Sequence, residues 1–349
     1  MCLVSQLNFC PVGEYLCSFF LSGYFFKNKY LDDVVAYVKK KVKHLMTPFI
    51  GYELFYAILT TVLLAAGFIK FGRTLSMASA VGVMCNKGSG WNGFTMAMWF
   101  VPALLLVQIF YIAVKKVFFA FCKNEWVLLV FFICLNLLSV KFSRLGYQHN
   151  GNIGSPGYSI LLFNACFLLA YYQLGYVYHN YIEKHDSFSF TKLVSPFIIN
   201  AFFIGILHIN LHYDVRMMKF NHDILPLHFI VGALGIYFWL HFSDLIAKVV
   251  SENDFIHKIS EKSYDIMVHH FLGIWLLNIF FIALIKLHIL KVSKFSYANF
   301  LNDGIKYQLP AGQPFTNVLY VIVGILFSVC VGTILDKITL KTKSLISKK

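Results

Sequence analysis

The sequence predicts an all-α protein, a polytopic integral membrane bundle of about nine transmembrane helices. Of its 349 residues, 58% are hydrophobic and only 13% are charged, well below the charged fraction of an average soluble domain. The charges stand in short clusters between apolar runs of about twenty residues, the length at which a helix crosses a bilayer. Because unpaired backbone groups are costly in hydrocarbon and the runs do not alternate, helices are expected rather than a barrel.

Nine apolar segments follow one another along the chain in a window of about nineteen residues. They are residues 7–26, 48–69, 95–114, 125–140, 158–178, 193–211, 224–243, 264–285 and 315–335. Between the first two, residues 27–47 combine valines near helical spacing with six lysines, which predicts a basic helix on the inner leaflet. A second surface helix is expected over 251–262. No internal repeat appears, so residues 1–349 are interpreted as one domain with a basic cytoplasmic tail at 336–349.

The placement of the basic residues predicts the orientation of the chain. With the amino terminus outside, the cytoplasmic loops and the tail hold 19 of the 30 Lys and Arg residues, as expected for a multi-pass protein of the plasma (inner) membrane. The formal charge of +14 therefore indicates contact with anionic membrane lipid rather than with nucleic acid. An odd number of helices with an external amino terminus is awkward to insert, so a further leading helix is expected before Met1.

Cysteine and histidine spacing argue against a metal site or a disulfide framework. The eight cysteines include no Cys-x-x-Cys pair and lie mostly in apolar runs, as small packing residues do. His208 and His212 have a spacing that presents two imidazoles to one metal ion. The His-x-x-His-His boxes of membrane di-iron enzymes are absent from the sequence, so no metal and no bound cofactor is expected.

Polar side chains inside the apolar segments are candidates for function because burying them in hydrocarbon is costly. They are Glu53, Gln108, Asn136, Asn164, Gln173, Asn200, His208, His228, His241, Asp265, His269, His270 and Asn278. Ser263 and His270, seven residues apart, share one stripe of a helix, whereas His269 points about 100° away. Asp265 precedes His269 by four residues, a spacing at which a carboxylate orients an imidazole. A hydrogen-bonded packing role is the equally common alternative for any one of these histidines.

Residues near the external helix ends are of the types that grip sugar rings by stacking and hydrogen bonding. Trp99, Asp214 and Arg216 belong to this group, together with Trp91 and Asn92. Two alternatives stay open: the tryptophans fit an interfacial aromatic belt equally well, and Asp214 and Arg216 suit a pair with each other. The glycine-rich stretches 86–93 and 146–157 lack the spacing of a phosphate-binding loop and are interpreted as turns.

Three motifs in the same order resemble the acyltransferase 3 family, in particular its fucose 4-O-acetylase-like branch. The run from Phe19 to Phe26 resembles the second helix of that family, and Trp99 to Leu104, continuing to Gln108, resembles the fourth. Ser263 to His270 is similar to the Ser-Tyr-Asp-Ile-Met stretch and following His of the ninth helix. The resemblance covers nearly the whole chain and implies ten transmembrane helices. The family's first helix, which carries its usual catalytic His, would precede Met1.

The resemblance implies an O-acyltransferase that moves an acetyl group from acetyl-CoA, as cosubstrate, to a hydroxyl of a surface polysaccharide or lipid-linked glycan. The expected catalytic residues are His270 and Ser263. The expected acceptor contacts are Trp99, Asp214, Arg216 and Gln108, and the expected supporting residues are Asp265, His269 and Ser22. A glycan or lipid transporter or flippase, and a noncatalytic homologue of the enzyme, are the alternatives.

Overall fold

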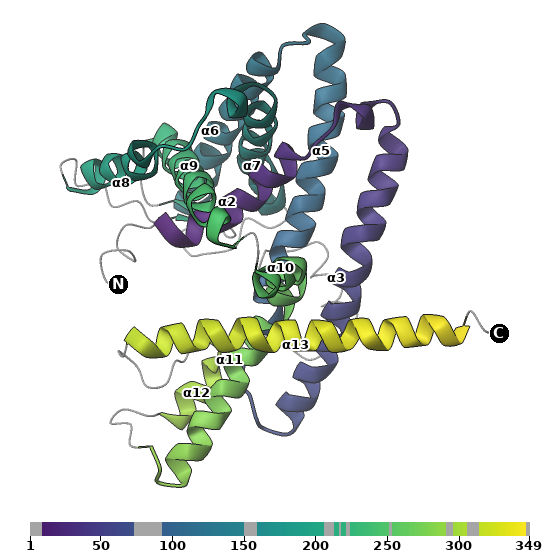
Figure 1. Cartoon of the computed structure of the whole chain (residues 1–349), viewed down its shortest axis with the longest axis vertical. Coiled ribbons are helices and arrows are strands. Elements are labelled where there is room, and N and C mark those ends of the chain that lie inside the picture. The colour runs from purple at the N-terminus through teal and green to yellow at the C-terminus, as the bar shows by residue number, and fades with distance from the viewer. Residues whose placement is uncertain are drawn as a thin grey trace. The chain divides into compact units, whose positions relative to one another are not determined.

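The computed structural model describes residues 9–72, 93–149, 159–205, 213–215, 218–220, 224–250, 253–290, 296–305 and 314–346 (Figure 1). The α-helices are α2 (Phe9–Tyr24), α3 (Val34–Ala65), α5 (Phe100–Phe121), α6 (Glu125–His149), α7 (Ser159–Val177), α8 (Phe190–Gly205), α9 (Leu225–Val250), α10 (Asp254–Glu261), α11 (Ser263–Lys286), α12 (Tyr297–Asp303) and α13 (Pro314–Ile346). Short turns of other helix types are η1 (Asn28–Leu31), η2 (Gly93–Trp99), η3 (Tyr178–Ile182) and η4 (Glu183–His185). The all-α membrane fold is thus confirmed.

Seven of the described helices are long and apolar enough to cross a membrane. Two of the nine predicted segments correspond to shorter helices, α2 with 16 residues and α8 with 16 residues. At 1.5 Å per residue, such a helix is about 24 Å long, less than the ~30 Å of a typical hydrocarbon core. Part of the predicted segment 193–211 lies outside the described residues.

Several helices extend beyond the apolar runs that predicted them. The predicted surface helix at 27–47 and the following membrane segment form one helix of 32 residues, α3, with Pro48 inside it. Similarly, α13 continues to Ile346, so most of the predicted tail at 336–349 is helical. Lysine is a good helix former, and therefore a change from apolar to basic composition marks where lipid ends but not where a helix ends. The second predicted surface helix is confirmed as α10.

The described residues divide into two compact units, and each is treated by itself below. The first unit contains residues 9–48 and 100–249, and the second contains residues 49–72, 93–99 and 250–346. That the whole chain forms one domain stays a prediction.

Helix α7 is the centre of the first unit, where it packs against α2, α5 and α6. Two glycines bring α2 and α7 together: a Cβ added to Gly23 would stand 1.8 Å from the carbonyl oxygen of Tyr172, and one added to Gly175 would stand 1.9 Å from that of Phe20. Small residues allow such close backbone approach between membrane helices. A π-helical turn, η3, follows α7 directly.

A short antiparallel ladder also belongs to the first unit. Strand β1 (Tyr213–Asp214) pairs with β2 (Lys219–Phe220), with Tyr213 opposite Phe220. The Ser143 hydroxyl on α6 donates a hydrogen bond of 2.6 Å to the Met218 carbonyl, which ties the ladder to the helices.

The second unit is built around the contact of α11 with α13 and with η2. Phe94 of η2 lies with its ring centroid 5.7 Å from that of Trp275 on α11, in an edge-to-face arrangement. The buried Asn278 side chain donates to the Gly304 carbonyl at 2.7 Å and accepts a hydrogen bond from the Tyr320 hydroxyl of α13. These contacts hold the middle of α11 against α13 and the segment around Gly304.

Candidate functional site

The two adjacent histidines of α11 face different neighbours. His269 is 1% exposed, and its Nδ1 lies 2.8 Å from the Tyr56 hydroxyl of α3. Its ring also meets the Tyr52 ring edge-on, with centroids 5.1 Å apart. His270 is half-buried and lies against α13, where Gly324 would place an added Cβ 3.5 Å from the His270 Cβ. The predicted divergence of the two imidazoles by about 100° is consistent with these separate contacts.

Asp265 does not orient His269, which corrects the expectation from their four-residue spacing. Its Oδ1 accepts a hydrogen bond of 3.2 Å from the Tyr52 hydroxyl, and its Oδ2 lies 3.4 Å from the Lys262 ammonium. Spacing places both residues on one face of α11, but the Tyr52 hydroxyl of α3 bonds Asp265 and the Tyr56 hydroxyl bonds His269. Tyr56 therefore orients His269 instead.

Lys262 directly precedes α11 and places a positive charge beside Asp265. It pairs with Asp265 and with Asp336 of α13. Burial by itself lowers the pKa of the Lys262 ammonium, but its hydrogen bond to Asp336 and its contact with Asp265 raise the pKa more, so the net pKa lies above the usual value. Lys262 is therefore a fixed positive charge at the start of α11.

Glu53 is a further acidic group of the second unit. It is 7% exposed, and its Oε2 accepts a hydrogen bond of 3.2 Å from the Thr95 hydroxyl of η2. Glu53 was predicted as a polar candidate, whereas Thr95, Tyr52 and Tyr56 were not. The four-residue step of the two tyrosines matches that of Asp265 and His269, a signal that becomes visible only when α3 and α11 are known to pair.

The expected catalytic pair, His270 and Ser263, does not share a hydrogen bond. His270 donates Nδ1–H to the Ile266 carbonyl at 2.8 Å, since a carbonyl oxygen can only accept. Ser263 is exposed at the first position of α11, about 10 Å from His270 along the helix axis at 1.5 Å per residue. A direct supporting role of Ser263 would therefore require a substrate or water between the two side chains.

The other predicted site residues are distributed over the chain. Trp99 ends η2 in the second unit and is 7% exposed, whereas Gln108 lies on α5 in the first unit and is 3% exposed. Ser22 is half-buried on α2. Asp214 lies in β1, and Arg216 lies outside the described residues, as do Trp91, Asn92, His208 and His212. Among the described residues, no group of His, Cys, Asp or Glu is arranged to hold a metal ion.

A buried ion pair in the first unit was not predicted. Lys115, counted in the sequence as part of a basic loop, is fully buried on α5, with its ammonium 2.8 Å from Glu125 of α6. The ammonium lies 3.4 Å from the ring centroid of Tyr176 and donates to the Tyr111 hydroxyl at 3.2 Å. The Gln173 amide completes the network by donating to Glu125 Oε2 at 3.0 Å. Every member has a partner, which is the arrangement of a structural network between α5, α6 and α7.

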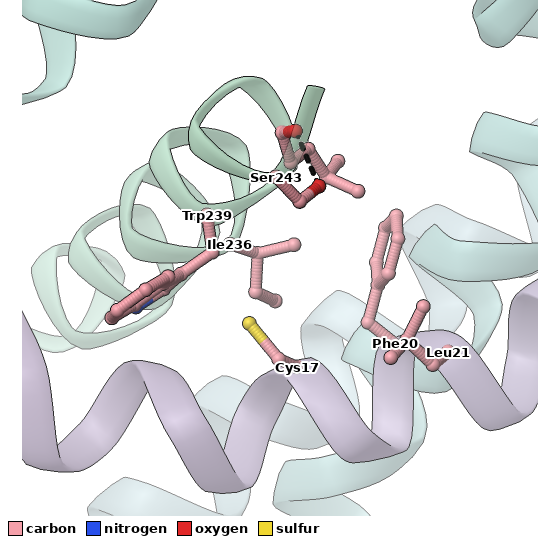
Figure 2. Close-up of a pocket in the computed structure, with 7 residues that line it drawn as sticks. Cys17, Phe20, Leu21, Ile236, Trp239 and Ser243 are labelled. Carbon is pink, nitrogen blue, oxygen red and sulfur yellow. Dashed lines mark hydrogen bonds between the residues drawn. The ribbon is translucent and has the colours of Figure 1, made fainter. Parts of the chain in front are cut away.

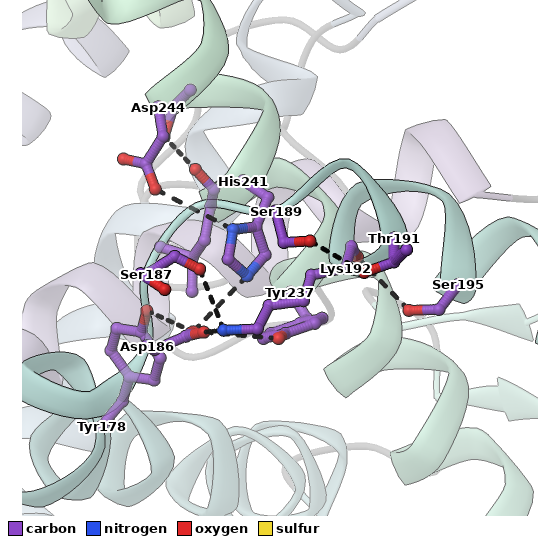
Figure 3. A network of polar contacts seen from close by, with 12 residues as sticks. Tyr178, Asp186, Ser187, Ser189, Thr191, Lys192, Ser195, Tyr237, His241 and Asp244 are labelled. Atoms are coloured by element: carbon purple, nitrogen blue, oxygen red, sulfur yellow. Dashed lines mark hydrogen bonds and ion pairs between the residues drawn. The ribbon is translucent and has the colours of Figure 1, made fainter.

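Asp186, in the loop after η4, collects a second polar network (Figure 3). Its carboxylate accepts hydrogen bonds from Lys192 at 2.5 Å, from Tyr178 at 2.9 Å and from Tyr237 at 3.5 Å, and His241 Nε2 lies 3.4 Å away. Burial by itself raises the pKa of the Asp186 carboxyl, but the hydrogen bonds from Lys192 and Tyr178 lower it more, so the net pKa lies below the usual value. The network fastens the loop to α8 and α9.

An apolar pocket of about 420 Å³ lies between α2 and α9 in the first unit (Figure 2). Its lining includes Phe20 and Leu21 from α2 and Ile236 and Trp239 from α9. The hydroxyl of Ser243, at its edge, already donates to the Leu240 carbonyl at 2.7 Å. Among the described residues, none of the predicted site residues lines the pocket, so it suits hydrocarbon rather than acyl-transfer chemistry.

The geometry of the site does not distinguish a membrane enzyme from a transporter, whereas comparison with known families does. The family model of the acyltransferase domain named acyltransferase 3 matches residues 19–337. The chain belongs to the acyltransferase 3 family. The family and the long apolar helices together make it a multi-pass membrane acyltransferase. No curated protein and no solved structure matches the chain.

The three motifs that carried the resemblance lie on well-defined elements of this acyltransferase 3 chain. Phe19 and Phe20 are buried on α2, close to the glycine contact with α7. Trp99 to Leu104 spans the junction of η2 and α5, and Ser263 to His270 forms the first two turns of α11. The motif on α11 therefore brings Asp265, His269 and His270 into the second unit, where the buried polar groups of α3 also lie.

Proposed function

We propose that this protein is an O-acetyltransferase of the plasma (inner) membrane. It transfers an acetyl group from acetyl-CoA to a hydroxyl of a surface polysaccharide or a lipid-linked glycan. Membership of the acyltransferase 3 family supports acyl transfer in general. The acetyl donor and the glycan acceptor are part of the proposal and follow from the resemblance to the fucose 4-O-acetylase-like branch.

The hydrogen bonding of His270 is the observation that carries the proposed chemistry. Because Nδ1–H is donated to the Ile266 carbonyl at 2.8 Å, the neutral ring has its lone pair on Nε2. A general base needs that tautomer, with one ring nitrogen held by a fixed acceptor and the other free to take a proton. Half-burial leaves the ring within reach of a substrate.

In the proposed reaction, Nε2 of His270 takes the proton from the acceptor hydroxyl as its oxygen attacks the thioester carbonyl. A carbon–oxygen bond forms, the carbon–sulfur bond breaks, and the sulfur leaves as a thiolate that requires a proton. The products are the acetyl ester and free coenzyme A. Within the second unit, Trp99 is proposed as an acceptor contact, with Ser263, Asp265 and His269 as supporting residues.

Labelled acetyl-CoA tests this function in membranes that contain the full-length protein. Wild type is expected to leave label on the glycan fraction. His270→Ala should reduce the labelling rate by about a hundredfold or more, the usual contribution of a general base. His257→Ala is the matched control, because that imidazole is 76% exposed on α10 and pairs with Glu261 on the same helix.

The possible results separate the proposed enzyme from its alternatives. Label on glycan with wild type and with His257→Ala, but not with His270→Ala, supports the proposal. Equal labelling by His270→Ala contradicts the role of His270. An absence of label with wild type, in membranes where the protein is folded, contradicts the enzymatic function and favours a transporter, a flippase or a noncatalytic homologue.

A further inference from the structure

A ladder of two polar contacts joins α3 and α11 inside the second unit. Tyr52 and Tyr56 are four residues apart on α3, and Asp265 and His269 are four residues apart on α11. The Tyr52 hydroxyl donates to Asp265 at 3.2 Å, and the Tyr56 hydroxyl lies 2.8 Å from His269 Nδ1. The Tyr52 ring also meets the His269 ring edge-on, so Tyr52 contacts both levels of the ladder.

The ladder ends on an open nitrogen. His269 is 1% exposed, and its Nε2 has no hydrogen-bond partner within the part of the chain that the structure describes. A buried imidazole nitrogen without a partner is costly in an apolar interior, and packing alone would favour an apolar side chain there. The unpartnered Nε2 of His269 is therefore available to bind a group of the substrate during the reaction.

The other end of the ladder reaches the start of α11. Lys262 lies outside the membrane-spanning part of that helix, and its side chain is 13% exposed. It lies 3.4 Å from Asp265, which in turn accepts from Tyr52. Polar contacts thus lead from the start of α11 to Tyr52, whose ring contacts the His269 ring.

We propose that His269 is a second acid–base group of acyl transfer, which protonates the departing sulfur, and that Tyr52 and Asp265 connect it to water at Lys262. The inference rests on the proposed function and adds a residue to it. As the carbon–sulfur bond breaks, Nε2–H of the His269 imidazolium passes to the thiolate. Water then supplies a proton to the neutral ring, while His270 returns the acceptor's proton to water, so protons balance.

Other charged or titratable groups lie around the ladder and belong to the same electrostatic environment. They are Glu53 on α3, His270 on α11, and Asp336 on α13, which pairs with Lys262. Asp265 lies one helical turn from His269 on the same helix, so its carboxylate belongs to this environment as well.

Deuterium exchange at the imidazole Cε1 position measures proton access to each histidine without requiring activity. The experiment uses the full-length protein in detergent, with fragmentation that separates His269 from His270. His269 is expected to exchange with deuterium from water. Tyr52→Phe should slow its exchange about tenfold or more, since the route through Tyr52 is interrupted. Tyr320→Phe is the matched control, because it removes another buried tyrosine hydroxyl of the second unit, one that donates to the Asn278 amide.

Activity supplies the second measurement. His269→Gln keeps a hydrogen-bonding partner for Tyr56 but cannot carry a proton, so kcat should fall about a hundredfold while KM stays near wild type. Tyr320→Phe should change neither constant. These rates are compared only for variants that melt within the range spanned by wild type and Tyr320→Phe.

Each result tests the role of His269 separately from the proposed function. A His269 ring that does not exchange in wild type is a sealed packing residue, which overturns the inference. Equal exchange in Tyr52→Phe and Tyr320→Phe overturns the route through Tyr52. A wild-type kcat for His269→Gln overturns the acid–base role. If wild type leaves no label on glycan, the proposed function fails, and exchange at His269 still shows whether its nitrogen meets water.

Discussion

Substitution of the paired glycines on α2 and α7 should separate these two helices. Gly23→Ala places a methyl group 1.8 Å from the Tyr172 carbonyl oxygen, and Gly175→Ala places one 1.9 Å from that of Phe20. Ordinary contact begins at 3.4 Å, so the backbones have to move apart by about 1.5 Å. Both obstacles are backbone atoms, which cannot rotate away as a flexible side chain can.

The expected cost is at the upper end of the range for overpacked cores, about 3 kcal/mol for each substitution. A loss of that size corresponds to a fall in melting temperature of roughly 6 °C or more for a unit of this size. Thermal unfolding of the detergent-solubilised protein measures it, with Gly51→Ala as the matched control. In the described part of the chain, no atom lies within 4 Å of a Cβ at Gly51, which is in the interior of α3.

Gly51→Ala should leave the melting temperature unchanged or raise it, because alanine is the better helix former by up to about 1 kcal/mol. If Gly23→Ala and Gly175→Ala unfold at the wild-type temperature, the close contact of α2 and α7 is wrong. If all three substitutions lower stability equally, the loss is unrelated to the helix contact.

Three further predictions concern buried charge and close packing. Lys115→Met leaves the Glu125 carboxylate buried without its cation and should cost about 3 kcal/mol, most of which Lys115→Met combined with Glu125→Gln should restore in thermal unfolding. The Asp186 carboxyl has a pKa below its unfolded value of about 3.9. Its contribution to stability is therefore complete above that pH and is lost as the pH falls through the lower folded pKa. The melting temperature should decline below about pH 4 in wild type and decline less in Asp186→Asn. Gly332→Ala places a methyl group 2.3 Å from Asp265 Oδ2 and should displace that carboxylate, lowering both acyl transfer and melting temperature.

Gly324→Ala is the control for Gly332→Ala, because both glycines lie on α13 and face α11. The methyl group at position 324 would stand 3.5 Å from the nearest atom, the His270 Cβ, which is an ordinary contact. Equal behaviour of the two alanine variants would contradict the close contact at Asp265. For Lys115, a double variant no more stable than the single one would show that the loss comes from packing rather than from the unpaired carboxylate. For Asp186, parallel pH curves for wild type and Asp186→Asn would contradict the depressed pKa.

The membrane fold could be predicted from the sequence because lipid imposes a simple condition: each apolar run must form a helix that satisfies its own backbone. Helix ends were less predictable. The lysines before Pro48 mark a change of solvent but continue α3 without a break, and Lys115 lies in the same kind of basic run yet is buried. Its partners, Glu125 and Tyr176, come from α6 and α7, so their proximity depends on helix packing that periodicity does not reveal.

The candidate site was predicted only in part, because spacing along one helix does not reveal contacts with other helices. Helical spacing correctly separated His269 from His270 by direction, because both lie on one helix. It wrongly paired His269 with Asp265, since spacing along α11 contains no information about the tyrosines of α3 that compete for both side chains. Tyrosine is also common in membrane helices, so Tyr52 and Tyr56 did not stand out.

The π-helical turn η3 places one extra residue just before the Asp186 loop. Such a turn accommodates one residue more than an α-helical turn of the same span. Deleting a single residue between Tyr178 and Ile182 would therefore leave an α-helical turn of the same span, and the segment after it would keep its direction. A deletion in the interior of α7 would instead rotate the following residues by about 100°. Homologous chains should therefore tolerate the loss of one residue in this turn more readily than in α7.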